Sequence, residues 1–310
     1  MSHSRARAGA SGNGTQFLDP KVLARISNLE LLARTVVDGF LNGLHRAPHL
    51  GVSMDFAEHR AYSPGDDIRH LDWKLLARTD RYYVKQFEAE TNANLVALLD
   101  VSASMNYRSD PEGVTKLDYG RFLAASLLHF SRKQRDRVGL LTFDSDVVDY
   151  VPPSARNLDL ALHTLARIDA GNPGLLRPSM MTAADRLGRR GVVAVISDLY
   201  EDVDEVVGSI RLLLGRGHDI VVFHILDLAE VEFPFDAKTA FEDIETGEQL
   251  PVVPDKLRDA YLTQMQEHRS GLEKKFSGDR VDYVPVTTDQ PLDLALFRYL
   301  TIREKKARRR

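Results

Sequence analysis

Residues 94–104 read NLVALLDVSAS and decide the fold of this chain. Residues 95–99 form an unbroken apolar run, which is typical of a strand buried on both faces of a parallel sheet. Asp100 follows the run directly, and the hydroxyl residues Ser102 and Ser104 come at alternate positions after it. The stretch therefore predicts a central strand that carries polar side chains at its carboxyl end.

The chain after this stretch alternates between short apolar runs and amphipathic segments. We expect strands at 138–143, 192–197, 220–226 and 281–286, and a hairpin edge at 147–151. We expect helices at 117–132, 158–168, 178–189, 203–214, 257–276 and 292–300. This alternation predicts an α/β fold, a doubly wound and mostly parallel sheet covered by helices on both faces. Short polar pieces near 231–252 predict a hairpin insertion.

The first 92 residues have a different texture. Residues 1–14 are small and polar, which predicts a disordered tail. From 15 to 92 we expect an N-terminal extension with a helix over 19–39, capped by Asp19, and a strand over 82–87. The α/β domain would then cover 93–302.

Composition excludes several classes of protein. The 310 residues include 41 Lys and Arg against 45 Asp and Glu, a net charge of -4, which argues against nucleic acid as the partner. Cysteine is absent, which excludes disulfides, thiolate zinc sites and cysteine nucleophiles. No apolar run approaches the roughly 18 residues of a membrane span, and the start lacks the apolar core of a secretory signal. We therefore expect a cytoplasmic protein.

The carboxyl end, residues 303–310, reads REKKARRR and forms a basic tail. Its cations can complement the dipole of a helix end. They can also make a peripheral contact with an anionic partner or a lipid surface. Both interpretations stay open at this point.

The polar residues after two of the predicted strands form a candidate metal site. Asp100, Ser102 and Ser104 alternate, so an extended loop turns their oxygens to one side. Asp198 directly follows the strand predicted at 192–197, and ligands of open parallel sheets bind at such strand ends. Carboxylate and hydroxyl oxygens suit Mg²⁺. The alternative is that both aspartates only cap the helices that follow them.

A second concentration of charge lies in the segment PGDDIRHLDW, residues 64–73. It can be a salt-bridged turn, in which arginines neutralise the acidic pair and the tryptophan anchors the segment on the core. It can also be a docking surface for another protein, because Arg and Trp are common interface anchors. The candidate partner-binding residues are Asp66, Asp67, Arg69, Asp72 and Trp73.

Two sets of residues carry a family resemblance. The residues DVSAS at 100–104, together with Ser197-Asp198, resemble the von Willebrand factor A domain and its metal-ion-dependent adhesion site. The stretch YSPGDDIRHLDWKLLARTDRYYVKQFEAETN, residues 62–92, resembles the bacterial domain-of-unknown-function family 58, which is usually encoded beside MoxR-type AAA+ ATPases. The resemblance covers residues 52–300.

The resemblance implies a ligand set for the candidate metal site. It implies Mg²⁺ bound by Asp100, Ser102, Ser104 and Asp198. It also implies a threonine ligand from the loop before the helix expected at 178–189. Counting back from Gly191 places Gly174 at that position, so one ligand is missing in this chain.

Two function classes remain. The resemblance implies a non-catalytic adaptor that works with a MoxR-type AAA+ ATPase in chaperone-like maturation or assembly of client proteins. The alternative is a Mg²⁺-dependent phosphatase or phosphoryl-transfer enzyme that uses Asp100 and Asp198, one as nucleophile and one on the metal. The chain has no GxxxxGK[ST] loop, no HExxH motif and no nucleophile elbow, and no lysine is obviously placed for a phosphate. We therefore favour the adaptor.

Overall fold

The computed structural model describes residues 19–46, 58–61, 82–86, 93–188, 190–236, 241–242, 249–250 and 253–307. Its central strands are β3 (Asn94–Asp100), β4 (Arg137–Phe143), β5 (Val147–Ser154), β6 (Val192–Ser197), β7 (Asp219–Leu226) and β10 (Asp282–Thr287). They form one six-stranded sheet in the order β10-β7-β6-β3-β4-β5. Every neighbouring pair is parallel except β4 with β5. The predicted doubly wound, mostly parallel α/β fold is confirmed.

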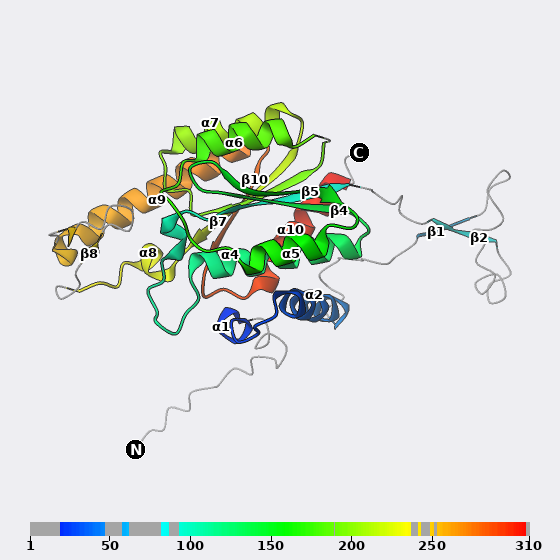
Figure 1. Ribbon diagram of the computed structural model, residues 1–310, viewed down its shortest axis with the longest axis horizontal. Helices are drawn as coiled ribbons and strands as arrows, with labels where there is room; N and C mark the ends of the chain where they lie inside the picture. The colour runs from blue at the N-terminus through cyan, green and yellow to red at the C-terminus, as the bar shows by residue number, and fades with distance from the viewer. Residues whose placement is uncertain are drawn as a thin grey trace, which may run out of the picture.

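Helices cover both faces of this sheet, as Figure 1 shows. One face carries α6 (Leu176–Arg186), α7 (Val203–Gly215) and α9 (Pro254–Asp279). The other carries α4 (Lys116–Lys133), α5 (Leu158–Ala166) and α10 (Leu292–Ala307). The basic segment at the carboxyl end thus begins within a helix, because α10 continues to Ala307.

Residues 95–99 of the central strand β3 are all apolar because the strand serves two hydrophobic cores. Leu95 and Leu99 belong to the core on the α4 face, whereas Val96 and Leu98 belong to the core on the α6 face. Successive side chains of a strand point to opposite faces, so a strand covered on both sides needs apolar residues at every position. Helix α4 lies directly on β3 at Gly120, where a Cβ atom would come within 2.8 Å of the Leu99 side chain.

The amino-terminal helical segment differs from the prediction of one helix over 19–39. There are two helices, α1 (Pro20–Leu23) and α2 (Leu29–Arg46). Asp19 caps the first and accepts a hydrogen bond from the Lys21 N–H at 2.8 Å. The Asn28 side chain accepts from the Leu31 N–H at 3.0 Å, so a second cap starts a new helix. Gly39 lies inside α2 and does not end it, because tertiary packing outweighs its low helix propensity.

Helix α2 is part of the α/β core rather than of a separate extension. Its buried side chains join the core on the α4 face, and the Phe40 ring meets Phe130 edge-on at 6.3 Å between centroids. The Lys133 ammonium on α4 pairs with Asp38 at 2.5 Å. Helix α2, which lies in the predicted N-terminal extension, therefore closes one core of the α/β domain.

The remaining elements are small. β1 (Glu58–Ala61) pairs antiparallel with β2 (Tyr83–Gln86), the strand expected over 82–87, and β8 (Phe241–Glu242) pairs with β9 (Gln249–Leu250) within the expected insertion. A short helix, α8 (Leu228–Glu232), was not predicted; its signal is the capping box formed by Asp227 and Glu230. None of the helices in the described ranges is long and apolar enough to cross a membrane. Residues 62–81, with the whole PGDDIRHLDW segment and its five candidate residues, lie outside the described residues.

Burial of His218 before β7 predicts a pH dependence of stability. Burial lowers the pKa of His218 in the folded chain below its ordinary value of 6.5. Below pH 6.5 the His218 imidazole is protonated in the unfolded chain but stays neutral in the folded chain until a lower pH. The free energy of unfolding therefore falls as the pH falls. We expect His218→Asn to make this decline shallower, by at most about 1.4 kcal/mol per pH unit. Urea unfolding from pH 7.5 to pH 5 measures it.

The matched control for this experiment is His163→Asn, at an exposed position of α5. The control should keep the decline of the unmodified chain. A His218→Asn curve that runs parallel to the unmodified chain over this pH range would contradict the prediction.

Candidate functional site

Four aspartates follow four strands at the carboxyl edge of the sheet. Asp100 ends β3, Asp144 follows β4, Asp198 follows β6 and Asp227 follows β7. The chain leaves β3 toward β4 on one side and returns to β6 on the other, so the topological switch point lies between β3 and β6. The structure therefore brings the predicted pair, Asp100 and Asp198, to adjacent strand ends.

Asp144 and Asp227 stabilise the loops in which they lie. The Asn172 amide donates to Asp144 at 2.8 Å and joins the loop before α6 to the end of β4. Asp227 caps α8 and accepts from both the hydroxyl and the N–H of Ser109, at 2.5 and 3.1 Å. Asp227 is thus a helix cap, and Asp144 fixes a loop.

Asp100 is buried, and both of its carboxylate oxygens accept hydrogen bonds. One accepts from the Ser102 N–H at 2.9 Å and the other from the Ser197 hydroxyl at 2.6 Å. Burial, followed by the negative charge of Asp198, raises the pKa of Asp100 to about 7. Within the described ranges no Lys or Arg forms an ion pair with Asp100. Its charge is therefore uncompensated by the part of the chain that the structure describes.

The two serine hydroxyls lie side by side next to Asp100. The Oγ atoms of Ser102 and Ser104 are hydrogen-bonded to each other at 3.1 Å, and Ser102 is buried. Two adjacent ligands of an octahedral Mg²⁺ ion, each at about 2.1 Å, are separated by about 3 Å. The spacing of the hydroxyls therefore suits two neighbouring positions around such an ion.

Gly174 lies against Ser102, where the resemblance implies a threonine. A Cβ atom at Gly174 would come within 2.9 Å of the Ser102 Cβ and 3.2 Å of its Oγ. A third hydroxyl has no room there unless Ser102 moves. The hydroxyls of Ser179 and Thr182 do not replace it, because they bind the Asp144 carbonyl and the Asp146 carboxylate.

Asp198 has a buried partner that sequence reasoning missed. The Lys116 ammonium, fully buried at the start of α4, lies 2.8 Å from Asp198 and 2.9 Å from Glu230. The third donor of the ammonium reaches the Tyr200 hydroxyl at 3.2 Å, which in turn donates to Glu230. Burial lowers the pKa of Lys116, but the two carboxylates raise it by more, and the net shift is upward. The ammonium stays charged inside the protein.

A signal for Lys116 exists in the sequence. Thr115 caps α4, which makes Lys116 the first residue of the helix. A cation at a helix N-terminus is unfavourable, because that end carries the positive pole of the helix dipole. This position is therefore a weak signal for acidic partners, and only the fold shows that Lys116 is buried and which carboxylates pair with it.

The backbone after Asp198 is held in a rarely populated conformation. Leu199 has a φ of 50°, in the left-handed region that non-glycine residues seldom adopt. Its N–H donates to the Ser197 hydroxyl at 3.1 Å, and its carbonyl lies 3.0 Å from the His268 ring. Since the same Ser197 hydroxyl donates to Asp100, the ends of β3 and β6 are fixed to each other.

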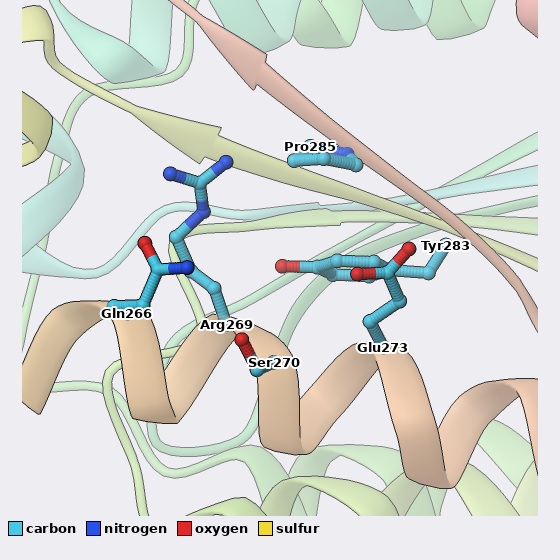
Figure 2. Close-up of a pocket in the computed structure, with 6 residues that line it drawn as sticks. All are labelled: Gln266, Arg269, Ser270, Glu273, Tyr283 and Pro285. Carbon is cyan, nitrogen blue, oxygen red and sulfur yellow. The ribbon is translucent and has the colours of Figure 1, made fainter.

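A small polar pocket of about 130 Å³ lies elsewhere, between α9 and the edge strand β10 (Figure 2). The Tyr283 hydroxyl in this pocket is 2.6 Å from Nδ1 of His224 on β7. Burial lowers the pKa of His224 to about 3, so the imidazole is neutral. None of the predicted site residues lines this pocket, whose lining consists of Gln266, Arg269, Ser270, Glu273, Tyr283 and Pro285.

The side chains at the end of β3 supply some, but not all, of the oxygen ligands that a hard cation such as Mg²⁺ needs. Over the described residues, no three His, Cys, Asp or Glu side chains converge on one point. The donors there are instead the Asp100 carboxylate and the hydroxyls of Ser102 and Ser104, with Asp198 already paired to Lys116. Two buried carboxylates, Asp198 and Glu230, share the Lys116 ammonium, whereas Asp100 has no ion pair among the described residues and is the carboxylate left for a cation.

Removal of the buried ammonium should cost far more than removal of an exposed one. We expect Lys116→Met to lower the free energy of unfolding by about 3–5 kcal/mol, because it leaves two buried carboxylates without their cation. The control is Lys133→Met, whose pair with Asp38 is about two-fifths exposed and should cost less than about 1 kcal/mol. Urea unfolding followed by circular dichroism measures both. Equal losses for the two variants would contradict the buried network.

A second variant tests the close approach of Gly174 to Ser102. We expect Gly174→Ala to destabilise the fold by about 1–3 kcal/mol, because the added methyl group overlaps Ser102. Gly215→Ala is the control, since a Cβ atom there meets no neighbour within 4 Å. The midpoint of thermal unfolding is measured for both variants. A Gly174→Ala protein as stable as Gly215→Ala would contradict the prediction, because it would show that the loop of Ser102 moves to make room for the methyl group.

Known proteins are similar to this chain in sequence or in structure. Two uncharacterised proteins, from Mycobacterium tuberculosis and Mycobacterium bovis, are each 28% identical over 298 residues, covering 93% of this chain and 92% of theirs. Among solved structures, the conserved hypothetical protein BatB from Bacteroides thetaiotaomicron aligns over 68% of this chain and 99% of its own, with 15% identity and a TM-score of 0.48. The SpRpn10 VWA domain aligns over 66% of this chain and 93% of its own, with 13% identity and a TM-score of 0.41.

A family model agrees with the resemblance inferred from residues 62–92. The model described as "Protein of unknown function DUF58" matches residues 58–271. This match spans the candidate metal residues and most of the sheet, which is more than half of the chain. The chain therefore belongs to the DUF58 family.

Proposed function

We propose that this protein is a non-catalytic adaptor that binds a partner protein at the carboxyl edge of its sheet. One observation carries the proposal: Asp100 is a buried carboxylate without a cation among the described residues, next to two serine hydroxyls at the switch point. Such a site attracts a cation with open positions. A partner carboxylate is the simplest group to complete it.

In this proposal Asp100, Ser102 and Ser104 hold Mg²⁺, and Asp198 stays paired with Lys116. When bound, the ion supplies a positive centre that an acidic side chain of the partner can reach. The chain orients the donors through the Ser102 N–H and the Ser197 hydroxyl, which fix the Asp100 carboxylate. Because Gly174 offers no hydroxyl, we expect weak binding of the ion in the absence of the partner.

We propose a MoxR-type AAA+ ATPase as the partner, with client proteins matured or assembled in the cytoplasm. The support is the family, whose members are usually encoded beside such ATPases. The charged segment at 64–73 is the second proposed contact, through Asp66, Asp67, Arg69, Asp72 and Trp73.

The contacts at Lys116 do not favour the phosphoryl-transfer alternative. A lysine that binds a phosphate needs a free donor, but all three donors of Lys116 are used. Turnover of a generic phosphate ester that Asp100→Asn abolishes would nevertheless overturn the adaptor proposal.

The experiment is a pull-down of the tagged chain from an extract of its own cells, with Mg²⁺ or with EDTA. We expect an AAA+ ATPase with Mg²⁺, and at least about tenfold less of it with EDTA or with Asp100→Asn. Asp159→Asn, an exposed carboxylate on α5, is the control and should capture the ATPase normally. Equal capture of an ATPase under all conditions would support the ATPase as the partner and would refute a role for the metal ion in binding it. Capture of no ATPase would refute this partner.

A further inference from the structure

An aromatic pocket of about 210 Å³ lies beside the candidate metal site. Its rim includes Ser104, so pocket and candidate site share a residue. Three separate segments build its walls: the loop after β3, the loop after β6, and the region from α8 to α9. The other lining residues are Tyr107, Lys116, Tyr200, Glu230, Phe233, Phe235 and Tyr261.

The polar floor of this pocket is already satisfied. All three donors of the Lys116 ammonium have acceptors within 3.2 Å. One oxygen of Glu230 accepts from Lys116 and Tyr200, and the other accepts from the Asp227 N–H at 2.7 Å. A charged occupant would therefore have to displace an existing bond, whereas an apolar occupant would not.

The walls are aromatic rings held in place by one another. Phe233 packs against Phe235 at 5.1 Å and against Tyr261 at 4.7 Å between ring centroids. The Lys116 ammonium lies 4.4 Å from the centre of the Tyr200 ring and 5.7 Å from that of Tyr107. Because this internal cation already occupies two ring faces, the pocket is a poor cage for a second cation.

Size and exposure fit one ring-sized occupant. A cavity of about 150 Å³ in another protein binds benzene, so 210 Å³ has room for a larger ring. Tyr200 lines the pocket and is 49% exposed, although its hydroxyl is hydrogen-bonded to Glu230. Covering this ring would remove apolar surface from water.

We propose that the pocket receives an aromatic side chain of the partner protein, from a position close to the acidic residue that binds the metal site. The shared rim at Ser104 sets this distance, since one short segment can reach both places. The partner motif is then an acidic residue with an aromatic residue nearby. This inference rests on the proposed function and adds the chemistry of the partner to it.

The pocket itself is tested with indole as the probe, by saturation-transfer NMR on the full chain. We expect saturable binding of indole that Phe235→Ala weakens at least about tenfold, since truncating one wall exposes the ring to water. The backbone carbonyl of Phe235, which accepts from Arg258 at 2.6 Å, is retained in this variant. Leu160→Ala, at an exposed leucine of α5, is the control and should bind indole unchanged. Absence of saturable binding, or equal competition by tetramethylammonium, overturns the proposal.

The role in partner binding is tested in the same pull-down. Phe235→Ala should lower capture of the ATPase at least about tenfold while leaving the remaining capture sensitive to EDTA. Asp100→Asn should bind indole normally. Capture that Phe235→Ala leaves unchanged overturns this inference and leaves the adaptor proposal standing. If no ATPase is captured by the unmodified chain, the adaptor proposal fails and the indole titration alone decides about the pocket.

Discussion

The buried ammonium of Lys116 is the interaction on which the carboxyl edge of the sheet depends. It joins the start of α4, the end of β6 and helix α8 through Asp198 and Glu230. A charge in such a place is tolerated only because each of its donors has an acceptor. The same contacts place Tyr200 and Glu230 at the floor of the aromatic pocket. Removal of this cation would thus disturb the strand end and the pocket together.

The two aspartates at the switch point consequently have different electrostatic surroundings. Asp198 has a cation, and Asp100 has hydrogen bonds only. The shared hydroxyl of Ser197, which donates to Asp100 and accepts from Leu199, keeps the two strand ends in register. Asp100 is therefore the residue at which an added cation changes the charge balance most.

Because Gly174 offers no hydroxyl, membership of the family does not by itself predict that this chain binds a metal ion. The backbone at Gly174 approaches Ser102 so closely that an added Cβ atom would lie 2.9 Å from the Ser102 Cβ. A chain can keep the fold and the serine pair of the resemblance and still bind its ion more weakly. Binding of a partner side chain in the adjacent pocket would then supply affinity that the ion does not.

Much of the fold could be predicted from residues 94–300. Strands buried on both faces are apolar at every position, and the helices between them show a 3.6-residue period, so element types followed from local pattern. The errors occurred where local signals were weak. Asn28 restarts a helix that hydrophobic spacing alone predicts as continuous, and α8 has only five residues, too few for a period to show.

The sequence by itself determined the α/β class and the placement of Asp100 and Asp198 directly after two buried strands, because these depend on local periodicity. The tertiary structure decided that these two strands are neighbours in the sheet. Only the tertiary structure decided that Lys116 pairs with Asp198 and Glu230, since these lie 82 and 114 residues away along the chain. The tertiary structure also decided that α2 belongs to the main core. Contacts between distant segments depend on how helices dock on the sheet, and no local pattern of residues encodes that geometry.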